Sequence, residues 1–224
     1  MSVSEAIARR QSVRAFKPDA VPQATVREIL DLARRAPSGG NLQPWRVYAL
    51  AGEPLAQFRA LIAEKLVRGV KESPEYDIYP PNLWEPLRTR RREAGALRYT
   101  ALGVTDKDKE GLEALTRWNY EFFGAPVGLF FCIDRRCGPP QWSDVGMYMM
   151  SVMLLATERR LDTCPQESWA SWPRAVAQFL DLPAQLMLFA GMALGYRDDS
   201  HSLNQFRTPR AGLEEFAELR GGAD

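Results

Sequence analysis

The segment from Asp144 to Leu161 places the strongest constraint on how this chain can fold. Its apolar residues cover nearly the whole circumference of a helix, and four of its residues are methionines. A helix with this pattern is buried in a core or an interface, and methionine-rich stripes are usually core. Its longest apolar run, Val145 to Ala156, is far shorter than the roughly 20 residues that cross a bilayer. We therefore expect a central helix that two copies of the chain bury against each other.

The other periodic patterns predict an α+β protein with many helices and few strands. Helices are expected over residues 2–10, 22–36, 53–70, 88–99, 109–123 and 172–180, with a final amphipathic stretch over 213–219. Strands are expected over residues 45–50, 127–133 and 186–190. The four prolines in residues 73–86 predict an irregular excursion rather than a linker, so we expect one domain over residues 1–224.

Composition excludes several classes of protein. Lys and Arg total 29 and Asp and Glu total 28, so no strong field attracts nucleic acid or an anionic membrane. One histidine and three cysteines without a CxxC pair give no reason to expect a metal site or a disulfide framework. The first ten residues lack the apolar core of a signal peptide. We expect a cytoplasmic protein with no nucleic-acid partner and no membrane partner.

Two polar segments carry the chemistry. The first is Arg9-Arg10-Gln11-Ser12-Val13-Arg14, in which three arginines and a hydroxyl group gather where the first helix meets an extended segment. In the extended part, Ser12 and Arg14 point to the same side. Guanidinium groups beside a hydroxyl suit a phosphate monoester, although a solvated helix end has the same composition. The second segment is Pro37-Ser38-Gly39-Gly40-Asn41, whose glycines allow close approach to a flat ligand. A plain turn between a helix and a strand fits this segment equally well.

Taken in order, these and later motifs resemble the nitroreductase family of FMN enzymes, and best its nitrobenzoate-reductase-like branch. The motifs are RQSVRAF from Arg10, APSGGNLQPW from Ala36, FGAPV from Phe123, DVG from Asp144, LDTCPQ from Leu161, and LGY from Leu194 ahead of Asn204 and Arg207. Each motif alone is common, but the ordered set covers nearly the whole chain. The resemblance implies a small, mainly antiparallel sheet surrounded by helices, and a homodimer with two FMN molecules at the subunit interface.

The resemblance also implies which residues bind FMN. They are Arg10, Gln11, Ser12, Arg14, Pro37, Ser38, Gly39, Asn41, Asp144, Pro165, Gln166, Glu167, Ser168, Arg207 and Arg210. In this arrangement the loop from Pro37 to Asn41 comes from the partner chain, and a backbone N–H between Pro165 and Ser168 reaches flavin N5. We expect Arg14 or Arg10 to stabilise negative charge near N1 and O2 of the flavin. Many family members have Glu-Gly where this chain has Glu167-Ser168.

The implied activity is a ping-pong reaction. NADH or NADPH reduces FMN and leaves, and a small aromatic substrate, a nitroaromatic or a quinone, then takes two electrons. Residues 73–123 are expected to form a lid whose aromatic side chains stack on the substrate. The basic run Arg88–Arg92 suits a carboxylate or a nucleotide phosphate, or is simply a solvated face. Reductive dehalogenation, enone reduction, flavin fragmentation and a non-catalytic flavin-binding module stay open as alternatives.

Overall fold

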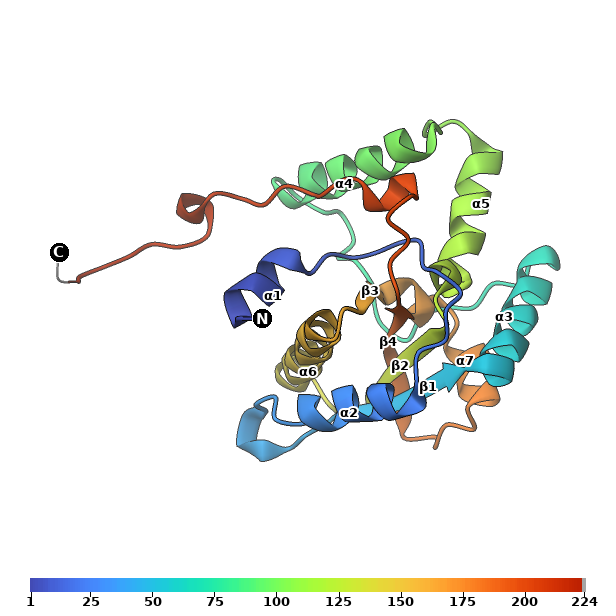
Figure 1. Cartoon of the computed structure of the whole chain (residues 1–224), viewed down its shortest axis with the longest axis horizontal. Coiled ribbons are helices and arrows are strands. Elements are labelled where there is room, and N and C mark those ends of the chain that lie inside the picture. Colours follow the sequence, from blue (N-terminus) through green and yellow to red (C-terminus); the bar gives the residue numbers. More distant parts are fainter. Residues whose placement is uncertain (223–224) are drawn as a thin grey trace.

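A four-stranded antiparallel sheet lies at the centre of the computed structural model, which describes residues 1–222 (Figure 1). The strands are β1 (Arg46–Ala51), β2 (Val127–Asp134), β3 (Asp162–Gln166) and β4 (Leu186–Gly195), in the order β1-β2-β4-β3. Every neighbouring pair is antiparallel. The inner strands β2 and β4 are buried along almost their whole length, which explains the continuous apolar run that predicted β2.

Helices cover both faces of this sheet. They are α1 (Val3–Arg9), α2 (Gln23–Ala33), α3 (Gly52–Val67), α4 (Leu87–Leu102), α5 (Lys109–Tyr120), α6 (Pro139–Glu158) and α7 (Pro173–Phe179). Along β2, Phe130 points to a cluster that includes α3 and α7, and its neighbour Phe131 points to a cluster that includes α2 and α6. This alternation is what the pleat of a strand imposes, and it divides the core into two halves.

The structure corrects several sequence-based boundaries; strand β4, for example, continues to Gly195 rather than ending at residue 190. Strand β3 was not predicted: Pro165 and Gln166 were expected in a loop, but they end this strand, and a short helical turn, Glu167–Ser171, follows. β3 lies at the edge of the sheet, where a proline is tolerated because its missing N–H faces no partner. Helix α6 begins at Pro139, earlier than predicted, because prolines fit the first turn of a helix.

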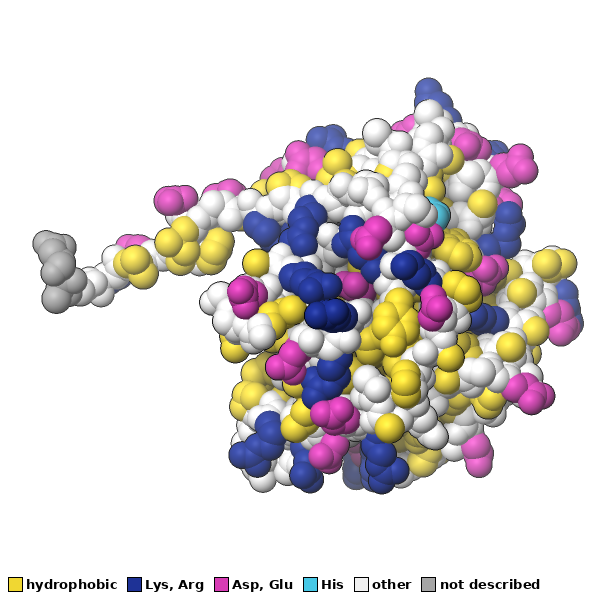
Figure 2. Space-filling model, viewed as in Figure 1, with side chains coloured by type: hydrophobic (Ala, Val, Ile, Leu, Met, Phe, Trp, Pro, Cys, Tyr) yellow, Lys and Arg dark blue, Asp and Glu magenta, His cyan; other side chains and the backbone are white. Residues whose placement is uncertain are grey.

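The predicted amphipathic tail is also shorter than expected. Within residues 213–219, only Leu213–Glu215 forms a helical turn. The tail leaves the body of the molecule (Figures 1 and 2) and exposes Phe216 and Leu219. The prediction of a single domain over residues 1–224 stays a prediction, and its last two residues lie outside the described part of the chain.

Helix α6 is buried on one side only. Val145, Tyr148 and Val152 are buried in the core, whereas Met147 is exposed and Met150 and Leu154 are half-buried. These last three residues follow helical spacing and therefore share one face. One side of α6 is therefore buried within the chain, as the sequence predicted. A second apolar side faces outward, and its predicted burial against another copy of the chain stays a prediction.

Candidate active site

A cavity of about 360 Å³ brings together predicted site residues from both ends of the chain. Arg10, Gln11, Ser12 and Arg14 contribute from the segment after α1, and Arg207 and Arg210 contribute from the tail. Ile7, Ala8, Met150, Phe206 and Thr208 complete its lining. Figure 2 shows basic side chains gathered around α1 and the base of the tail.

The charges of this cavity are unbalanced. Within residues 1–222, none of Arg10, Arg14, Arg207 and Arg210 forms an ion pair with a carboxylate. The pKa of Arg10 is lowered, first by burial and then by the positive charges of Arg210 and Arg207. Partly buried like charges destabilise a fold unless an anion joins them. The donor set therefore fits a phosphate group, which accepts charge-assisted hydrogen bonds from several guanidinium groups.

Backbone contacts hold the two ends of the chain in this arrangement. Arg207 donates hydrogen bonds to the backbone carbonyl oxygens of Ala8 and Arg9 at the end of α1. The last carbonyl groups of a helix accept no hydrogen bond from within the helix, so Arg207 supplies the missing donors. The backbone N–H of Val13 donates to the carbonyl oxygen of Thr163 at 3.0 Å. The extended segment after α1 is thereby fixed between the edge strand β3 and the tail.

Asn204 fastens the same segment from the tail side. Its Oδ1 accepts the backbone N–H of Arg14 at 2.8 Å, and its Nδ2 donates to the carbonyl oxygens of Ala15 at 2.9 Å and Asp198 at 2.8 Å. The side chain is buried. Asn204 is therefore a positioning residue that sets where Arg14 enters the cavity.

We predict that Asn204→Ala destabilises the protein by about 3 kcal/mol, because it leaves buried backbone groups without partners. The measurement is the midpoint of urea unfolding, with Ser202→Ala as the control. Ser202 lies in the same short turn and is exposed, so its loss should change stability by no more than about 0.5 kcal/mol. Equal midpoints for the two variants would contradict the positioning role.

A second cavity, of about 580 Å³, adjoins the first at Arg14. It contains the predicted residues Pro165, Gln166, Glu167 and Ser168. The rest of its lining comprises Ile78, Tyr79, Arg91, Arg98, Tyr99, Leu115, Thr116, Asn119, Tyr120, Phe123, Cys164 and Ser171. The predicted phosphate residues and the predicted ring-binding residues thus lie in adjoining cavities that share one arginine.

Hydrogen bonds fix the backbone from Pro165 to Ser168. Gln166 is buried, its Nε2 donates to Asn119 Oδ1 at 2.9 Å, and its Oε1 accepts from Trp169 Nε1 at 3.2 Å. Asn119 Nδ2 donates to Ser168 Oγ. Glu167 and Ser168 begin a helical turn, where the first backbone N–H groups lack acceptors within the turn. The segment can therefore offer backbone donors while the side chains of Gln166 and Ser168 stay hydrogen-bonded.

Burial shifts the pKa values of several groups in this cavity towards the neutral form, among them Glu167 and Cys164. Burial raises the pKa of the Glu167 carboxyl group. Burial also raises the pKa of the Cys164 thiol, although Arg14, Arg98 and Arg10 oppose that shift. Glu167 is therefore partly buried in this cavity, and the arginines supply positive charge near Arg14.

The loop from Pro37 to Asn41 lies outside both cavities of its own chain. The buried Asp144 carboxylate accepts the backbone N–H of Gly39, at 3.2 Å to Oδ1 and 3.3 Å to Oδ2. Asp144 thus anchors this loop against α6. The predicted roles of Pro37, Ser38, Gly39, Asn41 and Asp144 at a flavin belong to a dimer and stay predictions.

The sequence interpretation missed several lining residues. Arg98 lines the second cavity, its Nε is buried without an acceptor among residues 1–222, and burial followed by the charge of Arg14 lowers its pKa. Thr163 Oγ1 is also buried and has no hydrogen-bond partner in the described part of the chain. Helical spacing places Arg98 on the same face as Arg91 of the predicted basic run, so Arg98 could have been predicted from the sequence once the helix was predicted.

The predicted lid aromatics do not all reach the cavity. Tyr79, Tyr120 and Phe123 line it, but Trp84 is exposed. Tyr76 packs instead against the sheet, with its ring 5.3 Å from that of Trp142 and its hydroxyl donating to the carbonyl oxygen of Phe189. The region from 73 to 123 therefore contributes both packing and lining residues.

Residues 7–196 match the model of the Nitroreductase family. The chain belongs to the nitroreductase family. It is 35% identical to a 4-nitrobenzoate reductase of Pseudomonas putida, over 96% of this chain and 94% of the relative. It is 37% identical to a chloronitrobenzene nitroreductase of Comamonas testosteroni, over 96% of this chain and 95% of the relative.

Solved structures agree with this nitroreductase assignment. The FMN- and NADPH-dependent nitroreductase NfnB from Sphigopyxis sp. strain HMH superimposes with a TM-score of 0.95 and 44% identity, covering 99% of this chain and 100% of that chain. The FMN-dependent NfnB of Mycobacterium smegmatis in complex with NADPH gives 0.92 and 28%, covering 98% and 100%. The α+β nitroreductase fold expected from the motifs is therefore confirmed. Within residues 1–222, no helix has the length and apolarity needed to span a bilayer.

Proposed function

We propose that this protein is an FMN-dependent oxidoreductase that uses NADH or NADPH to reduce nitroaromatic or quinone-type compounds. The observation that carries the proposal is the cavity in which four arginines without carboxylate partners converge next to a second cavity that suits a flat ring system. The relatives named above are nitroreductases, and the named structures are FMN-dependent.

The two adjoining cavities suggest how the chain would hold FMN. Arg10, Ser12, Arg207 and Arg210 surround the cavity that fits the phosphate, and Arg14 stands between it and the ring cavity. When bound, FMN would supply the transfer of two electrons between the nicotinamide and the second substrate. The Arg14 guanidinium would stabilise negative charge on the pyrimidine side of the ring, which favours electron acceptance. The segment Pro165–Ser168 orients the ring through its backbone.

The lining of the ring cavity suits a flat second substrate. Tyr79, Tyr120 and Phe123 present aromatic surface on which an aromatic ring stacks. A nitro group is itself a strong electron acceptor, so the substrate needs little acid–base assistance. This requirement fits a chain whose only histidine, His201, lies outside both cavities.

A homodimer completes the proposed site. The outward apolar face of α6 includes Met150, which also borders the arginine cavity, so a partner seated on this face would reach the site. The exposed Phe216 and Leu219 of the tail offer further apolar surface for a second copy. Analytical ultracentrifugation should give twice the chain mass of 25.3 kDa, and a species of one chain mass would contradict the dimer. We also predict a cytoplasmic location, because NADH and NADPH are supplied inside cells.

Steady-state kinetics test the proposed reaction. With NADPH and a nitroaromatic varied together, a ping-pong mechanism gives parallel double-reciprocal lines. Intersecting lines would contradict it. Haloaromatics and enones as alternative acceptors, assayed anaerobically, separate the other chemistries that this scaffold supports. A non-catalytic module would bind FMN, but NADPH would reduce it no faster than free FMN.

A further inference from the structure

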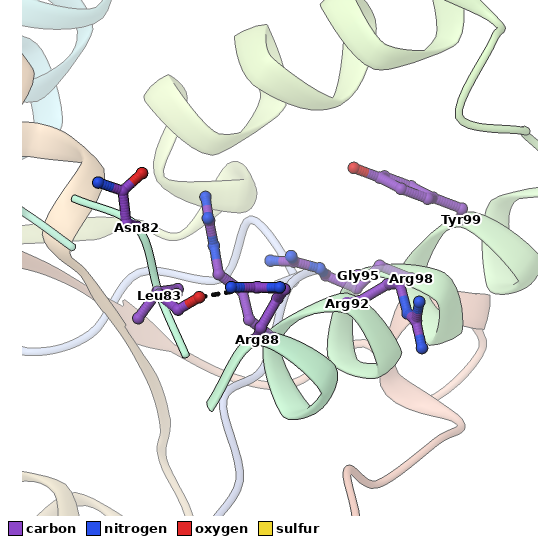
Figure 3. A pocket seen from close by; sticks show the side chains of 8 residues that line it. Asn82, Leu83, Arg88, Arg92, Gly95, Arg98 and Tyr99 are labelled. Atoms are coloured by element: carbon purple, nitrogen blue, oxygen red, sulfur yellow. Dashed lines mark hydrogen bonds between the residues drawn. The ribbon is translucent and has the colours of Figure 1, made fainter. Parts of the chain in front are cut away.

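An arginine-rich cavity of about 600 Å³ lies beside the candidate active site and has no role in the proposal above (Figure 3). Arg88, Arg91, Arg92, Gly95, Arg98 and Tyr99 line it from α4, and Asn82 and Leu83 line it from the segment just before that helix. No aspartate or glutamate is part of this lining. The cavity is therefore built to receive negative charge.

The arginines of this cavity are free to bind a ligand. Within residues 1–222, none of its four arginines forms an ion pair. Arg88 Nε donates to the carbonyl oxygen of Leu83 at 2.7 Å, which orients the guanidinium (Figure 3). The Arg91 guanidinium lies 4.1 Å from the centre of the Tyr79 ring, in a cation–π contact.

Nearby carboxylates do not neutralise these arginines. Arg90 pairs with Glu215 at 2.8 Å but does not line the cavity. The exposed Glu85 has a pKa lowered chiefly by its hydrogen bond with Thr89, and Arg88 and Arg92 contribute less. One exposed carboxylate leaves most of the positive charge of the cavity uncompensated.

This cavity joins the ring cavity of the candidate active site. Arg91, Arg98 and Tyr99 line both cavities. Arg98 also lies close enough to Arg14 for the charge of Arg14 to contribute, after burial, to its lowered pKa. A molecule with a flat group beside Gln166 and Glu167 can therefore extend over Arg98 into the arginine-rich cavity.

We propose that this cavity binds the 2′-phosphate end of NADPH and makes the protein prefer NADPH to NADH. The inference rests on the proposed function, in which the nicotinamide end enters the ring cavity. NADPH carries a phosphate monoester on its adenosine ribose where NADH carries a hydroxyl group. Arginine binds such a group through paired hydrogen bonds. Four arginines exceed what the single carboxylate of a nitrobenzoate requires, so the charge of the cavity favours the nucleotide.

Calorimetric titration of the FMN-loaded protein tests the binding site without turnover. The probes are 2′,5′-ADP, which carries the 2′-phosphate, and 5′-AMP, which lacks it. We expect 2′,5′-ADP to bind more tightly, and Arg92→Gln to weaken its binding by about tenfold while leaving 5′-AMP unaffected. The double variant Arg88→Gln/Arg92→Gln should weaken 2′,5′-ADP further. Equal affinity of the native protein for both probes would overturn the proposal.

The matched control is Arg90→Gln, on the same helix but outside the cavity. Its pair with Glu215 is partly exposed, so its loss should change the affinity for 2′,5′-ADP by no more than about twofold. Arg92→Lys keeps the charge and removes the paired geometry, so it should bind 2′,5′-ADP with intermediate affinity. If Arg90→Gln weakens the binding of 2′,5′-ADP as much as Arg92→Gln does, the loss reflects the overall positive charge of α4, and the assignment of the binding site to this cavity is wrong.

Kinetics separate this inference from the proposed function. In Arg92→Gln, kcat/KM should fall about tenfold for NADPH and stay nearly unchanged for NADH. An equal fall in kcat/KM for both nucleotides would mean that Arg92 contacts a group that they share, such as the pyrophosphate, and would overturn the inference. A loss confined to 4-nitrobenzoate, relative to nitrobenzene, would assign the cavity to a carboxylate and overturn it as well. If the protein binds no FMN at all, the proposed function fails, whereas titration of the FMN-free protein with 2′,5′-ADP still tests the cavity.

Discussion

Replacing Arg14 with alanine is expected to weaken FMN binding by about 1.5–3 kcal/mol, a loss of roughly 10- to 150-fold in affinity. Arg14 is the predicted FMN residue that lines both the phosphate cavity and the ring cavity, so its loss affects contacts at both. Asn204 holds its backbone N–H, and its guanidinium donates to the carbonyl oxygen of Ser12 at 3.2 Å, so the side chain is already positioned before the ligand arrives. The measurement is fluorescence titration of the flavin-free protein with FMN.

Arg9→Ala is the matched control for this experiment. Arg9 is close to Arg14 in sequence and carries the same charge, but its side chain lines a different cavity, of about 310 Å³. Its removal should change FMN affinity by only about 0.5 kcal/mol, since a screened charge outside the site contributes little. If Arg14→Ala keeps native affinity, or if Arg9→Ala weakens FMN binding equally, Arg14 has no direct role at the flavin.

Replacing Gly191 with alanine is expected to destabilise the protein by about 3 kcal/mol. A Cβ atom at this position of β4 would lie 2.2 Å from Trp169 Cδ1. Trp169 has no exposed surface. The centre of its ring lies 4.6 Å from the ring centre of Phe122 and 5.3 Å from that of Phe58. The indole therefore has no room to move aside. Urea unfolding followed by circular dichroism measures the loss of stability.

The same substitution should also lower the FMN content of the purified protein. Trp169 donates a hydrogen bond to Gln166 Oε1, so a displaced indole shifts the segment expected to orient the flavin ring. Gly95→Ala is the control: it lies within α4, and its Cβ would meet nothing closer than 3.9 Å. Alanine there should raise stability by up to about 1 kcal/mol. A Gly191→Ala protein as stable as Gly95→Ala would contradict the packing at Trp169.

Much of the fold is encoded in local patterns. The apolar spacing of α2 and the continuous apolar run of β2 were sufficient to predict both elements. The edge strand β3 was not predictable in this way. Its residues Asp162–Gln166 show no clear alternation of apolar and polar types, and its strand conformation depends on pairing with β4. Pairing with β4 therefore determines the conformation of a segment whose own sequence has only a weak preference for a strand.

The candidate site shows the same division. The resemblance to the nitroreductase family indicated Arg10, Arg14 and Arg207, and the structure places all three at one cavity. The role of Asn204 in holding Arg14 depends on a contact between residues 190 positions apart, which no local motif encodes. The placement of Arg98 beside Arg14 likewise depends on how α4 packs. The sequence therefore predicted arginines that share this cavity, whereas the contacts that hold them in place depend on the fold.

The most direct test of FMN-dependent function is the absorbance spectrum of the purified protein, loaded with FMN and passed through gel filtration, before and after anaerobic addition of NADPH. We predict a flavin spectrum that stays with the protein and is bleached by NADPH much faster than that of free FMN. A protein that remains colourless after incubation with FMN, or whose flavin is bleached no faster than free FMN, would contradict this function.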